Sequence, residues 1–290
     1  MNWVNGLQGS QVADSAKLGG QLPSAYLGAN QKAADSDKLD GLDSSNFAAY
    51  KRTVVVSPVG TPTQNGTALK NALGGISDAS ESNPYLLKIE PGIYDVGSAN
   101  NIPLIMKPYV DVEGSGEGIT TITATGFVSS SPNPNFLLEG YDNATVAGAA
   151  NSELRFLTVK STGGSIAKAI FGDANNFRLT NVTAVASDGG SWNFGVYVGS
   201  GRGPTDTMTI NQSTLTAHGQ AATIGVAGDP LGDVFVRNSQ ISGYNPADVA
   251  NHPVHVVASQ LLGEKLLARS AQASTTRTSP STPTPARRSA

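Results

Sequence analysis

An apolar pattern that returns every twenty-odd residues from Leu87 onward constrains the fold more than any other feature of the chain. Around each late repeat, two apolar residues lie two positions apart, and residues suited to an interior follow three and five positions later. Residues two apart share one face of a strand, and a three-residue step turns a corner into the next strand. The anchor residues of the successive periods are Ile89, Val112, Leu138, Phe156, Leu179, Ile210, Val236 and Val256.

One such period cannot bury its apolar face alone, so we expect neighbouring periods to stack. Each strand then pairs with its equivalent about 4.8 Å away, in the next coil. The sequence therefore predicts an all-β fold, a parallel β-helix of roughly eight coils over residues 51–262.

Composition agrees with stacked strands and excludes several kinds of partner. Charged residues make up 14% of the chain and there are 33 glycines, which suits strands and tight corners better than helices. The net charge of −3 argues against nucleic acid, because phosphate binding draws on clustered Lys and Arg. With no cysteine, neither a disulfide framework nor a thiolate site is available.

The first ten residues lack the basic and apolar regions of a secretory signal. No apolar run approaches the roughly 20 residues of a membrane span, so we expect no membrane span. We expect an extracellular or virion-associated protein: any export would use another route, and the alternatives are a fragment or a phage-type protein.

Two similar segments, Ala13–Tyr26 and Ala34–Phe47, are offset by 21 residues at every matched position. Each holds one Leu and one aromatic residue as its large buriable groups, too few to offset the entropy of ordering the segment alone. The pattern resembles the short stalk repeats of phage tail-fibre and bacterial surface proteins, which implies an elongated, often trimeric stalk. We expect residues 1–50 to be this stalk segment and residues 12–48 to mediate self-association; a disordered linker is the alternative.

Between the stalk and the first full period, residues 51–57 have the composition of a strand and Pro58–Gly66 that of a loop. Residues 67–76 show helical spacing and follow a candidate cap at Asn65 or Thr67. A short helix here would cover the open N-terminal end of the stack. Stacked coils need such a cap because an exposed β edge invites aggregation.

Residues 85–125 contain Tyr-Leu-Leu-Lys-Ile-Glu-Pro-Gly-Ile-Tyr-Asp-Val-Gly and then Val-Asp-Val-Glu-Gly-Ser-Gly. This text resembles the first coils of the pectin-lyase-like superfamily, which includes the pectin methylesterases. The resemblance implies a right-handed parallel β-helix. It says little about chemistry, because one fold hosts many functions.

Residues 263–290 abandon the pattern for Ala, Ser, Thr, Pro and Arg, a disordered composition. A shifted reading frame is the alternative, because Ala271–Ser279 can be encoded by a string whose other frame reads Cys-Ala-Gly-Val-Tyr-Asp-Glu-Asn-Phe. Sequencing the gene distinguishes the two.

The residues that such a resemblance implies for catalysis are missing. Pectin methylesterases use a nucleophilic Asp, an acid/base Asp and an Arg, but Ala169 stands where the motif Asp-Phe-Ile-Phe-Gly has its Asp, and Arg-Pro-Trp does not occur. The polygalacturonase motifs are also absent, since Ala217-His218-Gly219 falls short of Gly-His-Gly. Arg178 and Arg237 fall on strands without a carboxylate-rich column that a lyase would need.

One candidate site remains, a column of glutamates that follow the first three anchors: Glu90, Glu113 and Glu139. If the register holds, three carboxylates stack at one corner, where they raise each other's pKa or recruit a cation such as Ca²⁺. The functional interpretation is a Ca²⁺ site or an acid/base pair. The alternative is a set of solvated corner carboxylates.

Aromatic residues supply the candidate ligand platform. Trp192 follows a turn and is expected on a loop, where it could stack against sugars, with Tyr197 as a second ligand-binding residue; at least one of Phe194 and Tyr197 is expected in the core. The histidines at 218, 252 and 255 do not have metal-ligand spacing. We expect the asparagines at 176, 181 and 238 to turn corners, because Asn tolerates the left-handed conformation.

These patterns favour a non-catalytic surface protein of tail-fibre or adhesin type that displays a β-helix for contact with a polysaccharide or cell-surface glycan. No cofactor is required by the sequence, apart from the candidate Ca²⁺. The alternative is a carbohydrate-active enzyme, a polysaccharide lyase, hydrolase or pectinesterase-like protein, that acts on an acidic polysaccharide. A decayed gene that retains only the fold is a third interpretation.

Overall fold

A computed structural model describes residues 38–39, 42–43, 50–97, 104–126, 128, 144–172, 175–199, 205–219, 222–228, 232–243, 245–249 and 254–262. The chain divides into two compact units, Met1–Lys51 and Arg52–Ala290. In the first unit, the described strands β1 (Lys38–Leu39) and β2 (Leu42–Asp43) pair antiparallel.

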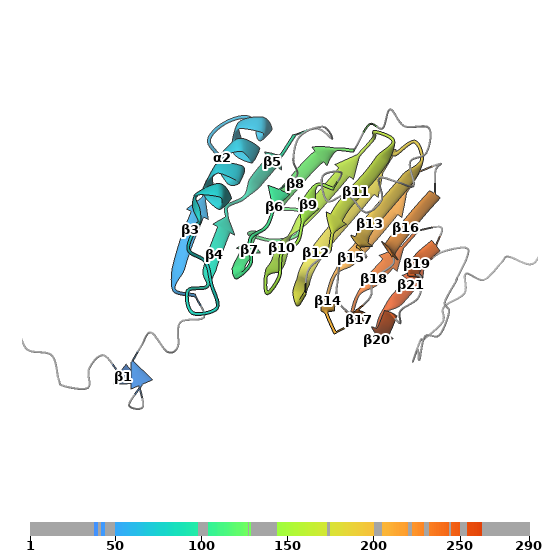
Figure 1. Cartoon of the computed structure of the whole chain (residues 1–290). Coiled ribbons are helices and arrows are strands. Elements are labelled where there is room, and N and C mark those ends of the chain that lie inside the picture. Colours follow the sequence, from blue (N-terminus) through green and yellow to red (C-terminus); the bar gives the residue numbers. More distant parts are fainter. Residues whose placement is uncertain are drawn as a thin grey trace, which may run out of the picture. The chain divides into compact units, whose positions relative to one another are not determined.

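The second unit is a parallel β-helix, as predicted, with three ladders of parallel strands (Figure 1). The first sheet contains eight described strands: β3 (Arg52–Val56), β4 (Tyr85–Ile89), β7 (Val110–Glu113), β10 (Glu153–Thr162), β12 (Phe177–Ser187), β14 (Thr207–Asn211), β17 (Asp233–Arg237) and β20 (Val254–Val257). Strands β10 and β12 are long enough to turn the corner into the second sheet.

The second sheet continues from the C-terminal halves of these two strands and contains β5 (Gly92–Asp95), β8 (Thr120–Thr125), β15 (Thr214–His218), β18 (Gln240–Ser242) and β21 (Gln260–Leu262). The third sheet contains β6 (Leu104–Ile105), β9 (Val146–Ala147), β11 (Ile166–Phe171), β13 (Trp192–Val198), β16 (Ala222–Gly228) and β19 (Asn245–Val249). The coils therefore have three sides, and buried residues from all three sheets meet in one large core.

The register of the first sheet confirms the late anchors and corrects the early ones. Leu179, Ile210, Val236 and Val256 pair in succession as predicted. Val112, however, pairs with Leu87 on one side and Leu154 on the other. The anchors Ile89 and Phe156 were therefore each two residues late, because a period of two cannot by itself distinguish neighbouring residues of one strand face.

Strand β7 pairs directly with β10. No strand of the first sheet lies between them, so the prediction of a coil anchored at Leu138 is wrong. Leu138 and Glu139 lie outside the described residues. The eight strands of the first sheet instead include β3, which precedes the first anchor.

Corners between the first and second sheets use a left-handed residue in every coil from β10 onward. This column has φ between 49° and 54° and consists of Phe156, Asn181, Gln212, Asn238 and Ala258. A second corner column includes Asn151 and Asn176, both with φ of 54°, and the Asn176 Nδ2 donates to Asn151 Oδ1 at 3.0 Å. The prediction that Asn176, Asn181 and Asn238 turn corners is confirmed. In the second corner column, Asn176 is also hydrogen-bonded to the asparagine of the preceding coil.

The capping helix is α2 (Pro62–Gly75), which begins five residues earlier than predicted. Its N-cap is Thr61 rather than Asn65 or Thr67, and Gln64 completes a capping box. Buried Leu69 and Leu73 join the core of the coil stack, and the helix lies beside β3 and β5 at the N-terminal end of the coils (Figure 1). Across the described ranges, no helix is long and apolar enough to span a membrane.

Candidate functional site

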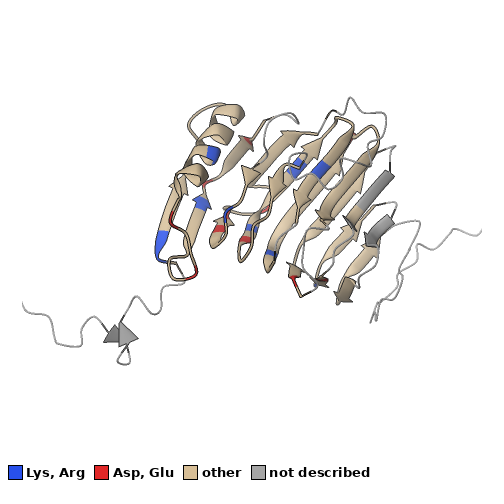
Figure 2. Ribbon diagram, viewed as in Figure 1, with Lys and Arg blue, Asp and Glu red and all other residues tan. Residues whose placement is uncertain are grey.

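Charged side chains gather on the outward face of the first sheet. Core residues alternate with outward ones along each strand, so the inward positions of Val112, Leu154 and Leu179 place their neighbours outside. Two registered rows result, one with Leu86, Asp111, Glu153 and Arg178, the other with Lys88, Glu113, Arg155 and Thr180. Figure 2 shows both signs of charge together on these strands.

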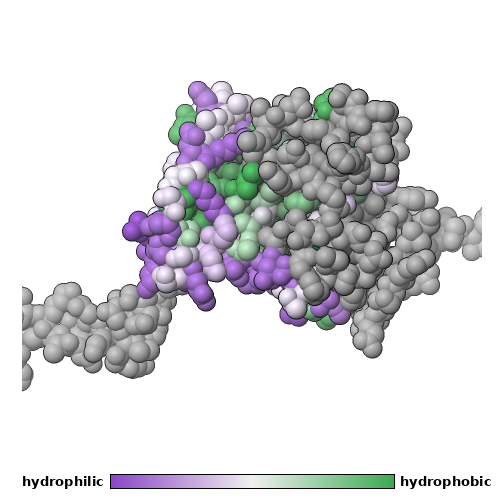
Figure 3. Space-filling view, in the orientation of Figure 1, coloured by the Kyte–Doolittle hydropathy of each residue, from purple (hydrophilic) through white to green (hydrophobic). Residues whose placement is uncertain are grey.

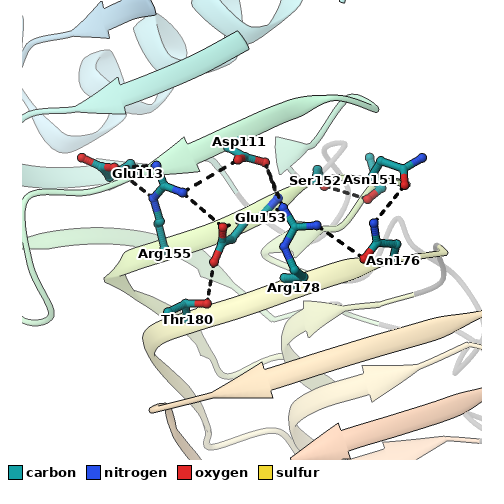
Figure 4. A network of polar contacts seen from close by, with 10 residues as sticks. Asp111, Glu113, Asn151, Ser152, Glu153, Arg155, Asn176, Arg178 and Thr180 are labelled. Carbon is teal, nitrogen blue, oxygen red and sulfur yellow. Dashed lines mark hydrogen bonds and ion pairs between the residues drawn. The ribbon is translucent and has the colours of Figure 1, made fainter. Parts of the chain in front are cut away.

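We call the six charged members of these rows the charged network: Lys88, Asp111, Glu113, Glu153, Arg155 and Arg178. Arg155 is its centre (Figure 4). Its Nε and Nη2 donate to Glu113 Oε2 at 2.9 and 2.8 Å, and its Nη1 donates to Glu153 Oε2 at 3.1 Å. Only 17% of the Arg155 side chain is exposed, and these short charge-assisted bonds fix its orientation.

Glu113 accepts from two cations, because Lys88 Nζ lies 2.5 Å from its Oε1. Glu153 accepts from Thr180 Oγ1 at 2.5 Å, and Asp111 Oδ1 accepts from the backbone N–H of Glu153 at 2.7 Å. The carboxylates are thus bound to donors within the network. Parallel pairing of β4, β7, β10 and β12 creates all of these contacts.

Arg178 differs from Arg155 in exposure and in contact distance. Its side chain is 35% exposed. It approaches Glu153 at 3.8 Å, Asp111 at 4.0 Å and the Asn176 Oδ1 at 3.4 Å. These contacts are long for an arginine, so Arg178 is better able than Arg155 to take an external partner.

The pKa of Glu113 lies below its ordinary value of 4.5. Burial is the largest single influence and would raise the pKa of this carboxyl, but hydrogen bonds from Lys88 and Arg155 and their positive charges together outweigh it. Glu113 is therefore ionised at neutral pH. A general acid needs a raised pKa, so Glu113 is suited to electrostatic or ligand-binding roles, or to acting as a base, rather than to donating a proton.

The predicted column of stacked glutamates is wrong. Lys88 and not Glu90 is in register with Glu113, because the anchor on this strand is Leu87. Glu113 accordingly has a lowered pKa, whereas stacked carboxylates would raise it. Glu90 is exposed at the end of β4, and Glu139 lies outside the described residues. Within the described ranges, no group of three or more His, Asp or Glu side chains could hold a metal ion.

The sequence interpretation missed most of the charged network. It placed Arg178 without carboxylate partners, but register brings Asp111 and Glu153 to it. The available signal was the spacing of charged residues two apart in Asp111-Val-Glu113 and Glu153-Leu-Arg155, which puts both charges of each strand on its outward face. Arg237 lies on the same face two strands beyond Arg178.

Trp192 and Tyr197 lie elsewhere, on the third sheet. Trp192 begins β13 rather than lying on a loop, and it stacks on Phe194 with ring centroids 5.6 Å apart. Phe194 and Tyr197 are both buried, in a satellite cluster with Phe171 and Ile166. Tyr197 is only 6% exposed, so it cannot offer a ring face to a ligand in this conformation.

Fully buried Lys168 belongs to this satellite cluster. Its ammonium lies 4.9 Å from the Phe171 ring centroid and 4.7 Å from that of Tyr197. These cation–π contacts help to compensate the burial of a charge. The region is a packed structural cluster, distinct from the charged network.

The outward rows continue past Arg178 toward the C-terminal end of the first sheet. The first row passes through Thr209, Phe235 and His255, and the second through Asn211 and Arg237. Phe235 and His255 stack with ring centroids 4.7 Å apart and an interplanar angle of 15°. The Arg237 guanidinium lies 5.5 Å from the centroid of the Phe235 ring, while His255 approaches Asp233 at 3.5 Å.

Comparison with known proteins identifies similar folds. No family profile matches the sequence, and no curated protein sequence matches it. Among solved structures, a pectin methylesterase in complex with a hexasaccharide is 13% identical, with a TM-score of 0.47, over 75% of this chain and 67% of that chain. The rice weevil pectin methylesterase is 14% identical, with a TM-score of 0.44, over 89% and 72%.

The A-module of an Azotobacter vinelandii mannuronan C-5 epimerase is 14% identical, with a TM-score of 0.29, over 68% of this chain and 71% of that chain. TM-scores below 0.5 at such low identity support no conclusion about this chain. The parallel pairing of β3 to β21 itself establishes that the chain has the parallel β-helix fold implied by the resemblance of residues 85–125.

Proposed function

We propose that this chain is a carbohydrate-binding β-helix protein and that an acidic polysaccharide lies across the outward face of its first sheet. The observation that carries the proposal is the charged network. In a chain with only 14% charged residues, three cations and three carboxylates converge on four adjacent strands. Such a concentration offers charged hydrogen-bond donors and acceptors to a polar, acidic ligand.

Arg155 and Arg178 have different parts in this proposal. Arg155 is held by two glutamates and keeps the network in place. Arg178 is more exposed and makes long contacts, so a bidentate bond to a sugar carboxylate would be stronger than the contacts it has. The ionised carboxylates beside it can accept hydrogen bonds from sugar hydroxyl groups.

Binding to pectin, polygalacturonate, alginate and neutral glycans, measured by calorimetry at fixed salt, tests the proposal. We expect the acidic glycans to bind and Arg178→Gln to weaken binding by about tenfold, equivalent to about 1.4 kcal/mol. Lys160→Gln is the matched control, because Lys160 is an exposed cation on the outward side of the second sheet. Equal loss in both variants would indicate non-specific charge attraction and contradict the proposal.

A second candidate function is catalysis on an acidic polysaccharide. The observation that favours it is the ionised Glu113 beside Arg155, since an ionised carboxylate can act as a base or a nucleophile. Product release from the same glycan panel, lost in Glu113→Gln while binding persists, would select this function. Binding without product release would support the binding function and contradict catalysis.

Self-association through residues 12–48 is part of the proposed function as well, because multivalent display would raise the apparent affinity for a repetitive polymer. Light scattering at several protein concentrations tests it. A trimer that dissociates when residues 1–50 are deleted supports the stalk, and a monomeric full-length chain contradicts it.

A further inference from the structure

Beyond the charged network, the outward rows of the first sheet place a small side chain between two large ones. Thr209 of β14 pairs with Arg178 on one side and with Phe235 on the other. Neighbouring strands lie about 4.8 Å apart, so Arg178 and Phe235 are separated by about two strand spacings across the short threonine. All three side chains are partly exposed.

The Phe235 ring is held in one orientation. His255 stacks on it from β20, with centroids 4.7 Å apart and planes within 15° of parallel. Phe235 and His255 are in register on adjacent strands, so a stack between them lies along the line of the coils. The opposite face of the Phe235 ring is therefore directed toward the β14 side, where Thr209 lies.

Polar groups surround the same position. Arg237 is exposed and has its guanidinium near the Phe235 ring, at 5.5 Å from the centroid. Asn211 lies beside Thr209 in the second row, in register with Arg237. Arg178 borders Thr209 on the other side, but its guanidinium is directed toward Asn176, Glu153 and Asp111, away from β14, with contacts of 3.4 Å or more (Figure 4).

We infer that one anionic sugar unit binds over Thr209, with a ring face against Phe235 and its acidic group paired with Arg237. An aromatic face with nearby hydrogen-bonding groups suits a pyranose, which has apolar C–H faces and polar edges. Asn211 and the Thr209 hydroxyl would contact the sugar hydroxyls. This inference rests on the proposed function, because it assigns a specific subsite to the binding face.

Two substitutions test the subsite directly, with an oligogalacturonate of defined length as the probe. Thr209→Tyr places a large ring where the sugar would lie, and Phe235→Leu removes the aromatic face. Each should weaken binding about tenfold or more, corresponding to about 1.4 kcal/mol. Thr216→Tyr is the matched control, because Thr216 is a partly exposed outward threonine on β15 of the second sheet; it should bind as the wild type does.

Arg237→Gln separates charge from stacking. This variant should bind the oligogalacturonate more weakly and bind a neutral oligosaccharide of the same length as the wild type does. Phe235→Leu should weaken the binding of both. Thermal unfolding of each variant establishes that the fold persists; if Thr209→Tyr fails to fold, Phe235→Leu and Arg237→Gln carry the test.

The outcomes separate the subsite from the proposed function. Wild-type protein that binds through Arg178 but is unaffected by Thr209→Tyr, Phe235→Leu and Arg237→Gln would overturn the subsite alone. Wild-type protein that binds no acidic glycan would overturn both. Selective loss in the three variants, with normal binding by Thr216→Tyr, would establish the subsite.

Discussion

Phe156 and Asn181 occupy the same corner in successive coils, with φ of 54° and 52°. An asparagine tolerates this left-handed conformation because its side chain bonds locally, whereas the Phe side chain lacks that compensation. Phe156 is 38% exposed, so burial of its ring does not explain the choice of residue. Asn occupies this corner in two of the five coils, at positions 181 and 238, and Phe156 is the bulkiest residue in the column.

We expect Phe156→Asn to stabilise the protein by about 0.5–1 kcal/mol, because it relieves left-handed strain at little cost in burial. The reciprocal change, Asn181→Phe, should destabilise by about 1–2 kcal/mol. Urea denaturation of both variants measures the free energies of unfolding. A loss of stability in Phe156→Asn would show that contacts of the Phe ring outweigh the strain.

A second prediction concerns the packing of α2 on the coils. A Cβ at Gly66 would lie 1.8 Å from the backbone oxygen of Asp95, whereas a Cβ at Gly74 of the same helix would meet nothing within 4 Å. Gly66→Ala should therefore destabilise by about 1–3 kcal/mol or more, since the helix must move away from β5. Gly74→Ala should be neutral or stabilise by up to about 1 kcal/mol.

Thermal unfolding measures the stability of both variants. Because both are Gly→Ala changes in the same helix, the difference between their stabilities reports the close approach of Gly66 to the Asp95 backbone. Equal effects of the two substitutions would contradict it. The helix position is then fixed by Gly66, a residue that helix propensity alone would disfavour.

The periodic fold was predictable because apolar residues recur at equivalent inward positions of successive coils, and Leu179, Ile210, Val236 and Val256 mark one such column without ambiguity. The register of the early coils was not. Leu87 and Ile89 are both fully buried, so the apolar pattern fits either residue as the anchor. An error of two residues preserves every inward face and changes every outward neighbour.

The charged network shows the consequence of that error. With Ile89 as the anchor, Glu113 would lie beside Glu90, whereas Leu87 as the anchor brings Lys88 beside it. The same residues thus predict either a repulsive carboxylate column or an ion-pair network. Functional contacts across coils depend on register, which is the property that an apolar period specifies least.

A third prediction concerns the serine column at the corner after the left-handed residues. The Ser239 Oγ accepts from the Ser213 backbone N–H at 3.1 Å and donates to the Arg237 carbonyl at 2.7 Å. Ser239→Ala leaves the buried N–H without this acceptor and should destabilise by about 1–3 kcal/mol. Ser242→Ala is the control, since Ser242 is only half-buried and bonds Thr216 Oγ1; a change under about 1 kcal/mol is expected. Urea denaturation measures both losses of stability. A larger loss in Ser242→Ala than in Ser239→Ala would contradict the contribution of the serine column.

The last prediction concerns the pH dependence of the charged network. The folded-state pKa of Glu113 is lowered from 4.5, so the ionised carboxylate stabilises the fold above that pH and its contribution is lost as the pH falls through the folded-state pKa. Glu113→Gln should cost about 1–3 kcal/mol at neutral pH, because Lys88 and Arg155 lose their charged acceptor. Below pH 4.5 the wild type should lose this advantage progressively, and the two proteins should converge.

Urea denaturation at several pH values between 7 and 3 measures that convergence. Glu90→Gln is the matched control, because Glu90 is an exposed carboxylate at the end of β4, and its substitution should change the free energy of unfolding by under about 0.5 kcal/mol throughout. A difference between Glu113→Gln and the wild type that does not shrink with acid would mean that the glutamate acts through packing. The ion pairs with Lys88 and Arg155 would then not be what stabilises the outward face of the first sheet.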